Sequence, residues 1–428
     1  MIKKCDVLIV GTGAAGLFCA LNFPENKDIL IITKKTAEES DSFLAQGGIC
    51  MLRGEEDYEQ YFEDTMKAGH YENNPKTVEL MIRSSNSVIR ELIEYGVRFE
   101  RDDKGELEYT KEGAHSQPRI LFHEDITGKE ITSTLLARVK ERKNIKIEEY
   151  TTMLDIVAKD NVCGGIVAMK QDGRKYIIEA NNVVLACGGI GGLYTNSTNY
   201  PHITGDALAI CLKHGVEVEN VSYIQIHPTT LYSKRPGRRF LISESVRGEG
   251  AFLYNKSQER FTDELQPRDL LSEAIWKQME EDGTSYVWED LRPIGKETIL
   301  NHFPNIYERC LEEGYDVLEE PIPVVPAQHY HMGGISVNLA SQTSMKGLYA
   351  AGEACCNGVH GKNRLASNSL LESLVFAQRA ADDIMFGTKS YGCDVSDVDL
   401  EQYSDTGKIF RSYQKLIFDR IEKEKNNE

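Results

Sequence analysis

The sequence predicts an α/β protein in which a domain built on a parallel sheet is split in two by an inserted segment. An apolar run at residues 5–10 leads into a glycine-rich turn and an apolar helix, and a second apolar run follows at residues 29–33. Strand, turn, helix and strand in this order form a βαβ unit of the Rossmann-like type. The pattern of a strand followed by glycines occurs again at residues 183–189 and, after a long intervening segment, at residues 347–353.

The segments between these patterns divide the rest of the chain. Residues 58–95 have helical periodicity that stops at Gly96. Residues 146–178 have the pattern of a small antiparallel layer, with turns expected at Gly164-Gly165 and Asp172-Gly173. We therefore predict a discontinuous domain of residues 1–220 and 336–388, an inserted α+β capping domain of residues 221–335, and a short helical tail of residues 389–428, whose end we expect to fray.

Composition narrows the classes of function. Hydrophobic residues make up 41% of the 428 residues, charged residues make up 27%, and no apolar run approaches the roughly 20 residues that span a bilayer. The formal net charge of -18 disfavours nucleic-acid binding. Ten scattered cysteines without C-x-x-C pairs, and an N-terminus without the pattern of a secretory signal, predict reduced thiols and a cytoplasmic protein with no membrane contact.

The glycine-rich turn predicts a dinucleotide site. Its residues are Gly11, Gly13, Ala14, Ala15 and Gly16, in the spacing G-x-G-x-x-G, which lets backbone N–H groups approach a pyrophosphate at a helix N-terminus. After the second strand the chain has Thr33-Lys34-Lys35, where NAD sites commonly place an acid. A mobile NAD is thus disfavoured, and Lys34 either contacts the adenosine or phosphate part of the cofactor or is a solvated lysine.

The later glycine-rich segments favour FAD. Residues 347–353 end in Glu353, which can accept hydrogen bonds from ribityl hydroxyls. Ser369 and Glu372 have the spacing of a capping box, so a helix is expected to begin there with its positive end towards the flavin. That orientation stabilises the negative charge of a reduced flavin and favours hydride acceptance.

Several further motifs together resemble the L-aspartate oxidase family, within the fumarate reductase and succinate dehydrogenase flavoprotein superfamily. They are S-F-L-A-Q-G-G at residues 42–48, Q-I-H-P-T at 225–229, E-S-V-R-G-E-G at 244–250, P-R-D at 267–269 and H-Y-H-M-G-G at 329–334. The resemblance extends over residues 5–386. Related full-length oxidases continue into a larger C-terminal helical domain, whereas only a short tail follows Gly387 here.

The resemblance implies further cofactor residues, namely Ser42, Ala45, Gln46, Gly47, Gly48, Asp206, Ser367, Ser369 and Leu370. In succinate dehydrogenases a histidine four positions before the alanine of A-Q-G-G holds FAD covalently. Asp41 occupies that position here, so FAD is expected to be non-covalent.

The resemblance also assigns a site for a dicarboxylate. The expected substrate-binding residues are Gln225, His227, Ser243, Glu244, His329 and Arg364, together with Glu112, which would counterbalance or orient a substrate ammonium group. Arg268 is the expected catalytic arginine. Because free arginine is a poor base, Glu249 or Asp269 is expected to act as a relay acid.

Each of these residues also has a structural reading. The two histidines can be satisfied core residues, Ser243 can cap local backbone, and Arg268 can belong to a structural salt bridge. His329 and His331 have spacing compatible with a metal, but no third ligand is evident, and we predict no metal.

The implied reaction is oxidation of L-aspartate to iminoaspartate, with oxygen or fumarate reoxidising FAD. This is the first step of de novo NAD biosynthesis, and it implies a functional link to a quinolinate synthase. A soluble fumarate reductase is the nearest alternative, against which the loop around Glu112 argues. A redox-silent FAD-binding or scaffold protein is the alternative from another class.

Overall fold

The computed structural model describes residues 2–235, 237–387 and 393–427. Its largest sheet has seven strands in the order β5-β2-β1-β8-β7-β6, with β16 also paired to β8. The strands are β1 Ile2–Val10, β2 Ile29–Ile32, β5 Ile145–Glu148, β6 Thr151–Lys159, β7 Val162–Lys170, β8 Lys175–Leu185 and β16 Leu348–Ala350. β5, β2, β1, β8 and β16 are parallel, whereas β6 and β7 are antiparallel. The parallel sheet predicted from the βαβ pattern is confirmed.

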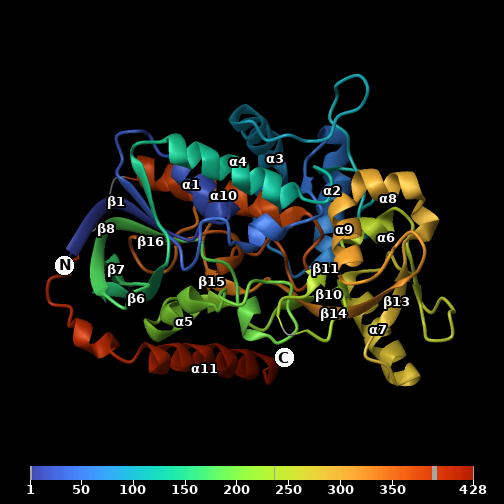
Figure 1. Ribbon diagram of the computed structural model, residues 1–428. Coiled ribbons are helices and arrows are strands. Elements are labelled where there is room, and N and C mark those ends of the chain that lie inside the picture. Colours follow the sequence, from blue (N-terminus) through green and yellow to red (C-terminus); the bar gives the residue numbers. More distant parts are fainter. Residues whose placement is uncertain (1, 236, 388–392, 428) are drawn as a thin grey trace.

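Helices cover both faces of this sheet (Figure 1). They are α1 Ala14–Leu21, α2 Tyr58–Ala68, α3 Pro75–Tyr95, α4 Thr127–Glu141, α5 Asp206–Lys213 and α10 Asn368–Phe386, with the short 3-10 turns η1 Asp41–Leu44, η2 Glu55–Asp57, η3 Gly191–Leu193 and η5 Gly352–Ala354. α1, α4 and α10 lie together above the sheet in Figure 1, and α5 lies below it. α3 ends at Gly96 in the left-handed conformation, with φ of 103°, so the predicted helix stop is confirmed.

The second sheet has five antiparallel strands in the order β11-β10-β14-β13-β12. Its strands are β10 Ile224–Leu231, β11 Phe240–Leu241, β12 Phe252–Tyr254, β13 Val287–Asp290 and β14 Ile322–His331, and its helices are α6 Glu244–Gly248, α7 Arg268–Asp282, α8 Lys296–His302 and α9 Pro304–Glu312, with η4 Arg292–Ile294. This unit, called the cap below, lies at the right of Figure 1 and has its own apolar core. The predicted domain boundaries at residues 220/221 and 335/336 remain a prediction.

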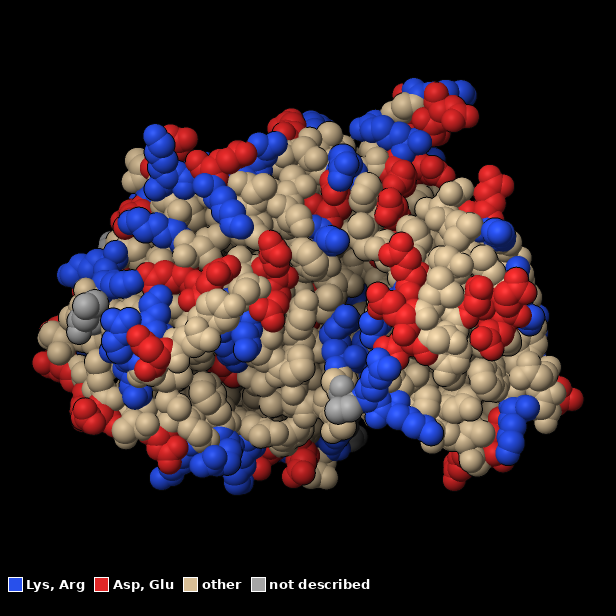
Figure 2. Space-filling view, in the orientation of Figure 1, with Lys and Arg blue, Asp and Glu red and all other residues tan. Residues whose placement is uncertain are grey.

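Two small sheets and a helical tail complete the structure. The small sheets contain β9 Val218–Glu219, β15 Gly334–Ser336 and β17 Cys355–Cys356, and β3 Ile49–Cys50 with β4 Ile120–Leu121. The tail contains η6 Leu400–Tyr403 and α11 Thr406–Lys425, and residues 388–392 of the predicted tail lie outside the described residues. Acidic and basic side chains are mixed over the face seen in Figure 2.

The prediction that the tail end frays is wrong for the described residues. α11 buries Tyr413, Ile417 and Ile421 against the core beside α5. Near its end, the Glu424 carboxylate accepts a hydrogen bond of 2.8 Å from the Ser222 backbone N–H. A buried apolar stripe together with a polar anchor is what holds this helix in place.

One predicted turn is also misplaced. β6 and β7 are joined at Asp160 and Asn161, both with positive φ, and Gly164-Gly165 lies inside β7. A Cβ at Gly165 would lie 2.0 Å from the Ile178 carbonyl oxygen of β8. Glycine there permits close strand packing instead of a turn, whereas the turn predicted at Gly173 is confirmed by its φ of 84°.

The core of the cap contains an unusual acid, Glu289 of β13. It is 0% exposed, and neither carboxyl oxygen has a hydrogen-bond partner among the described residues. Burial raises its pKa to about 8, although the nearby Arg247 partly opposes the shift. The folded protein therefore binds a proton here that the unfolded chain releases near pH 4.3, and its stability falls as pH rises from about 4.3 to about 8.

We expect Glu289→Leu to stabilise the protein by about 1–3 kcal/mol at pH 8, because it removes a buried unsatisfied carboxyl group from apolar surroundings. The gain should shrink towards pH 5. Urea unfolding at both pH values measures the difference. Glu273→Leu on the exposed side of α7 is the matched control and should show no such pH dependence. A destabilised Glu289→Leu protein at pH 8 would mean that the carboxyl group makes a favourable contact.

Candidate functional site

The predicted dinucleotide turn lies between β1 and α1 and depends on glycine for steric reasons. Gly11 has φ of +116°, and a Cβ on it would lie 2.1 Å from the carbonyl oxygen of Ala186 at the end of β8. A Cβ on Gly16 would lie 2.2 Å from the Gly11 carbonyl oxygen. The turn is therefore pressed against the neighbouring strand, and the Ala14 backbone N–H donates to Ser42 Oγ at 3.1 Å.

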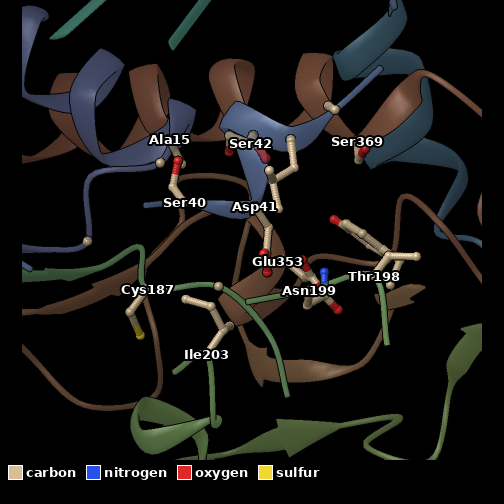
Figure 3. Close-up of a pocket in the computed structure, with 18 of the residues that line it drawn as sticks. Ala15, Ser40, Asp41, Ser42, Cys187, Thr198, Asn199, Ile203, Glu353 and Ser369 are labelled. Carbon is tan, nitrogen blue, oxygen red and sulfur yellow. The ribbon is translucent and has the colours of Figure 1, made fainter. Parts of the chain in front are cut away.

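A single cavity begins at this turn and extends to the cap. Its empty volume is about 1650 Å³, including the part that opens to solvent. The predicted cofactor residues that line it are Gly11, Gly13, Ala15, Lys34, Ser42, Ala45, Gln46, Gly47, Gly48, Asp206, Glu353, Ser367, Ser369 and Leu370. Ala14 and Gly16 lie in the same turn but do not line the cavity. Figure 3 shows its wall, with Ser40, Asp41 and Ser42 from the segment at η1 and with Glu353, Cys187 and Ile203 from other elements.

The cavity wall carries polar atoms that need partners. Thr12 Oγ1, Ser40 Oγ and Gln46 Oε1 are buried, line the cavity and have no hydrogen-bond partner among the described residues. At the cap end, His227 Nε2 and Arg364 Nε are also buried without a hydrogen-bond partner among the described residues. A long ligand with phosphates, hydroxyls and carbonyl groups would satisfy this set, so the residues present fit an FAD molecule.

Lys34 is partly exposed and forms an ion pair. Its Nζ lies 2.6 Å from Asp206 Oδ2 and donates to the His202 carbonyl oxygen at 2.8 Å. Because Lys34 and Asp206 line the cavity as an ion pair, they neutralise each other at the end near the glycine turn.

The helix expected at Ser369 begins one residue earlier. α10 starts at Asn368 after Ser367, whose φ is 61°, and neither Ser367 nor Ser369 caps it with a side-chain hydrogen bond. Ser369 Oγ instead accepts from Arg364 Nη1 at 2.8 Å, and Glu372 accepts from Asn357. The predicted capping box is wrong because both side chains are used by tertiary contacts.

At the cap end, Arg268 is bound by two buried side chains. It is the first residue of α7, its Nε donates to Glu244 Oε2 at 2.6 Å, and its Nη1 donates to Gln225 Oε1 at 2.9 Å. Burial would raise the pKa of Glu244, but Arg268 and Arg247 outweigh burial and hold it below its usual value. Gln225 lies behind Arg268 and, unlike the other predicted substrate residues, does not line the cavity.

The two acids predicted as relays lie elsewhere. Glu249 is exposed, does not line the main cavity, and lies 4.0 Å from His302 Nδ1. The Asp269 carboxylate contacts His70 Nε2 at 3.0 Å, away from the cavity. Arg268 and Asp269 are neighbours in the first turn of α7, where successive side chains point in different directions. The acid that the structure brings to Arg268 is Glu244.

Two histidines form part of the cavity wall opposite the arginines. The rings of His227 and His329 lie 5.1 Å apart in an edge-to-face arrangement. His227 Nδ1 lies 3.2 Å from the Thr229 backbone N–H, and His329 Nδ1 lies 2.7 Å from Thr198 Oγ1. Burial lowers the pKa of both rings well below its usual value, and neighbouring arginines add to the shift, so both rings are neutral at pH 7.

Arg364 and Ser243 complete the set at this end of the cavity. Arg364 lies over the Tyr330 ring, with its guanidinium carbon 4.5 Å from the ring centroid. Burial, with Arg268 nearby, lowers the pKa of Arg364 to about 10, so it still carries a full charge at neutral pH. Ser243 caps α6 by accepting from the Ser245 backbone N–H, which is the structural role considered for it, and it also lines the cavity.

Glu112 connects the two parts of the protein at the same place. Its Oε2 accepts from Ser367 Oγ at 2.6 Å and its Oε1 accepts from Ser245 Oγ of the cap at 2.8 Å. Burial and the charge of Glu244 raise the pKa of Glu112. A buried acid with raised pKa beside two arginines is a strong signal of a functional site.

Sequence reasoning passed over several residues of this site. Arg247 lies 3.9 Å from Glu244 and was contained in the motif at residues 244–250, so the motif could have identified it. Tyr330 also lines the cavity and was contained in the motif at residues 329–334, whereas no pattern in the sequence pointed to Thr198, Asn199 or Arg238, which line it as well. His331 Nε2 donates to the Val221 carbonyl oxygen at 3.0 Å, and the described residues contain no group of three or more potential metal ligands.

Comparisons with known proteins agree with this site. The family model described as "FAD binding domain" matches residues 6–370. The L-aspartate oxidase of Clostridium perfringens is 51% identical over 385 residues, which cover 90% of this chain and 87% of that protein. That of Clostridium acetobutylicum is 43% identical over 99% of this chain and 98% of its own length. The latter alignment shows that the short tail is shared with a relative.

Solved structures give the same fold. A mutated E. coli quinol fumarate reductase FrdA has a TM-score of 0.88 and 30% identity, over 95% of this chain and 74% of that chain. A Mycobacterium smegmatis Sdh1 structure has a TM-score of 0.78 and 29% identity, over 95% of this chain and 72% of that chain. The split FAD-binding fold with a cap is thereby confirmed, FAD is the cofactor, and the chain belongs to the L-aspartate oxidase family of FAD-binding flavoproteins.

Proposed function

We propose that this protein oxidises L-aspartate to iminoaspartate, the first step of de novo NAD biosynthesis. The observation that carries the proposal is one cavity that runs from the glycine turn to two buried arginines, two neutral histidines and the buried acid Glu112. A doubly charged C4 substrate requires this donor set at its two carboxylates. The names of the two clostridial relatives support L-aspartate as that substrate.

The carboxylates would be held by donors that have no other partner. Arg364 presents Nε, and its other side is fixed by Ser369 and the Tyr330 ring. Thr229 fixes the His227 ring through Nδ1, which lies 3.0 Å from the Thr229 carbonyl oxygen, and Thr198 fixes the His329 ring through Nδ1 at 2.7 Å, so that Nε2 of His227 is left without a partner among the described residues. These fixed donors orient the substrate before reaction, which reduces the entropy lost in reaching the reactive geometry.

Glu112 is the residue that would distinguish aspartate from succinate. An ammonium group beside its carboxyl would favour the ionised form and replace the two serine hydroxyls as partner. Succinate brings no such cation, so Glu112 would retain its raised pKa beside Glu244. The charge balance of the buried site therefore favours a substrate with two carboxylates and one ammonium.

FAD supplies the hydride acceptor when it is bound. Arg268 positions the substrate and stabilises charge, while Glu244, held at 2.6 Å, is the acid placed to exchange a proton with it. Arg247 lies 3.9 Å from the same Glu244 oxygen that Arg268 binds, so both arginines favour the ionised form of Glu244. Glu249 and Asp269 are not needed in this scheme.

The finer points of the proposal concern electron acceptor, attachment and partner. We propose that oxygen or fumarate reoxidises the flavin, and that FAD is non-covalent because Asp41 offers no nucleophilic nitrogen. Iminoaspartate is a reactive imine, so a quinolinate synthase is the expected user of the product.

All ten cysteines are free, which supports a reducing, cytoplasmic location. No helix among the described residues is long and apolar enough to cross a bilayer.

The test is flavin absorbance under anaerobic conditions. We expect L-aspartate to bleach the flavin band rapidly, and D-aspartate and succinate to leave it unchanged. Admission of fumarate or air should then restore the band. Bleaching by succinate would instead indicate a fumarate reductase. A yellow protein that no dicarboxylate bleaches would indicate a redox-silent FAD-binding protein.

A further inference from the structure

The wall of the FAD cavity contains two carboxyl groups that come from distant segments of the chain. Asp41 belongs to η1 after β2, and Glu353 belongs to η5 after β16. Both residues line the same cavity, and both are labelled near its centre in Figure 3. Neither forms an ion pair with a described residue, although this cavity also contains the Lys34–Asp206 pair.

Each carboxyl group has few donors. Asp41 Oδ1 accepts from the Tyr200 backbone N–H at 2.8 Å, and its Oδ2 is buried without a hydrogen-bond partner among the described residues. Glu353 Oε1 accepts from the His331 backbone N–H at 2.9 Å. Both residues are partly buried, Asn199 is a further hydrogen-bond partner of Asp41, and the charge of Asp41 raises the pKa of Glu353.

The remaining charges near the pair do not neutralise it. Arg238 favours ionisation of Asp41, Arg364 favours ionisation of Glu353, and Glu372 opposes it. Burial dominates and raises the pKa of Asp41 to about 7 and that of Glu353 to about 8. Glu39, whose pKa is lowered, and His202, whose pKa is lowered by burial, also line the cavity, and Tyr200, whose pKa is raised by burial, contacts Asp41 through its backbone N–H.

We propose that Asp41 and Glu353 form an acid pair that holds one proton near neutral pH, and that FAD binds more tightly while this proton is in place. The physical reason is electrostatic. The FAD pyrophosphate brings two negative charges into a cavity already bordered by the pair, and a doubly ionised pair repels both itself and the cofactor. With one proton retained, the pair carries one charge and can still accept a hydrogen bond from a cofactor hydroxyl.

This inference concerns the cofactor site and does not depend on which dicarboxylate is oxidised. The direction of the pH effect follows from the coupling between proton binding and FAD binding. Because the complex holds a proton that a fully ionised pair lacks, FAD affinity should fall as pH rises through about 7 to 8. Two interacting acids titrate as a unit, so replacing either one removes the repulsion and should flatten the profile.

The experiment dilutes the purified holoprotein and measures released FAD by its fluorescence, from about pH 6 to about pH 8.5. For the natural protein we expect the dissociation constant of FAD to rise at least about 10-fold over this range. Asp41→Asn keeps an oxygen that accepts from the Tyr200 backbone N–H and replaces Oδ2 with a neutral amide donor. It should bind FAD at the upper pH at least as tightly as the natural protein and show a nearly flat profile.

Three further variants make the test decisive. Glu353→Gln should also flatten the profile. Glu372→Gln is the matched control, since this buried acid has a pKa of about 7 but does not line the cavity, and it should keep most of the natural slope. Asp41→Ser serves if the asparagine variant does not fold. A natural-type slope in Asp41→Asn, or a natural protein whose FAD affinity is independent of pH, would overturn the proposal.

Discussion

Arg268→Leu should lower the turnover number with L-aspartate by about 10³-fold or more while the protein remains yellow. The guanidinium group is the only cation that contacts both Glu244 and Gln225 among the described residues, and it lines the cavity at its cap end. The glycine turn that is expected to contact the pyrophosphate lies at the other end of the cavity. The loss should therefore appear in the chemical step and not in flavin content.

The measurement is single-turnover flavin reduction together with the FAD-to-protein ratio. Arg268→Lys is the matched variant, because one ammonium group keeps the charge but cannot reach two partners as the planar guanidinium does. It should bind FAD as the natural protein does and recover only part of the rate lost in Arg268→Leu. Near-natural flavin reduction in Arg268→Leu would remove Arg268 from the mechanism.

Arg119→Met should have the largest effect on stability, with an expected loss of about 3–5 kcal/mol. Arg119 is 0% exposed, and its guanidinium binds Asp57 through Nη2 at 2.8 Å and Asp64 through Nη1 at 2.7 Å. Removing the arginine leaves two carboxylates together in a buried position without their counter-ion. The same change releases the loop that carries Glu112 from α2, so the KM for L-aspartate should also rise.

The unfolding midpoint in urea measures this loss. Arg98→Met is the control for a lost arginine. Arg98 pairs with Glu130, but the Arg98 side chain is 74% exposed. Solvent screens the charge of so exposed an arginine, so the Arg98–Glu130 pair should add little to stability. If the two variants unfold at the same urea concentration, the buried network around Arg119 is not what stabilises this loop.

Much of the fold was predictable because local sequence and local geometry agree there. The βαβ unit follows from apolar runs and a turn that only glycine can form at Gly11. The stop of α3 follows from Gly96. The turn misassigned at Gly164-Gly165 shows the limit of this reasoning, because Gly165 packs against the neighbouring strand β8 and Gly164 against Cys393 of the tail, and neither contact is visible in the local pattern.

The residues of the site were predictable as a set, but their pairings were not. Glu244, Glu249 and Asp269 are all acids within motifs near Arg268 in the sequence, and nothing in spacing alone ranks them. The direction of each side chain on α6 and α7, set by how these helices pack on β10, places Glu244 at Arg268 and turns Asp269 towards His70.

By itself the sequence determined the parallel sheet, the FAD-type turn and the family motifs, because these depend on residues close together in the chain. Only the tertiary structure decided which carboxyl groups lose their water. Glu112, Glu289, Asp41 and Glu353 owe their raised pKa values to burial by segments far away in the sequence. Desolvation depends on everything packed around a group, so it emerges only when the whole chain is folded.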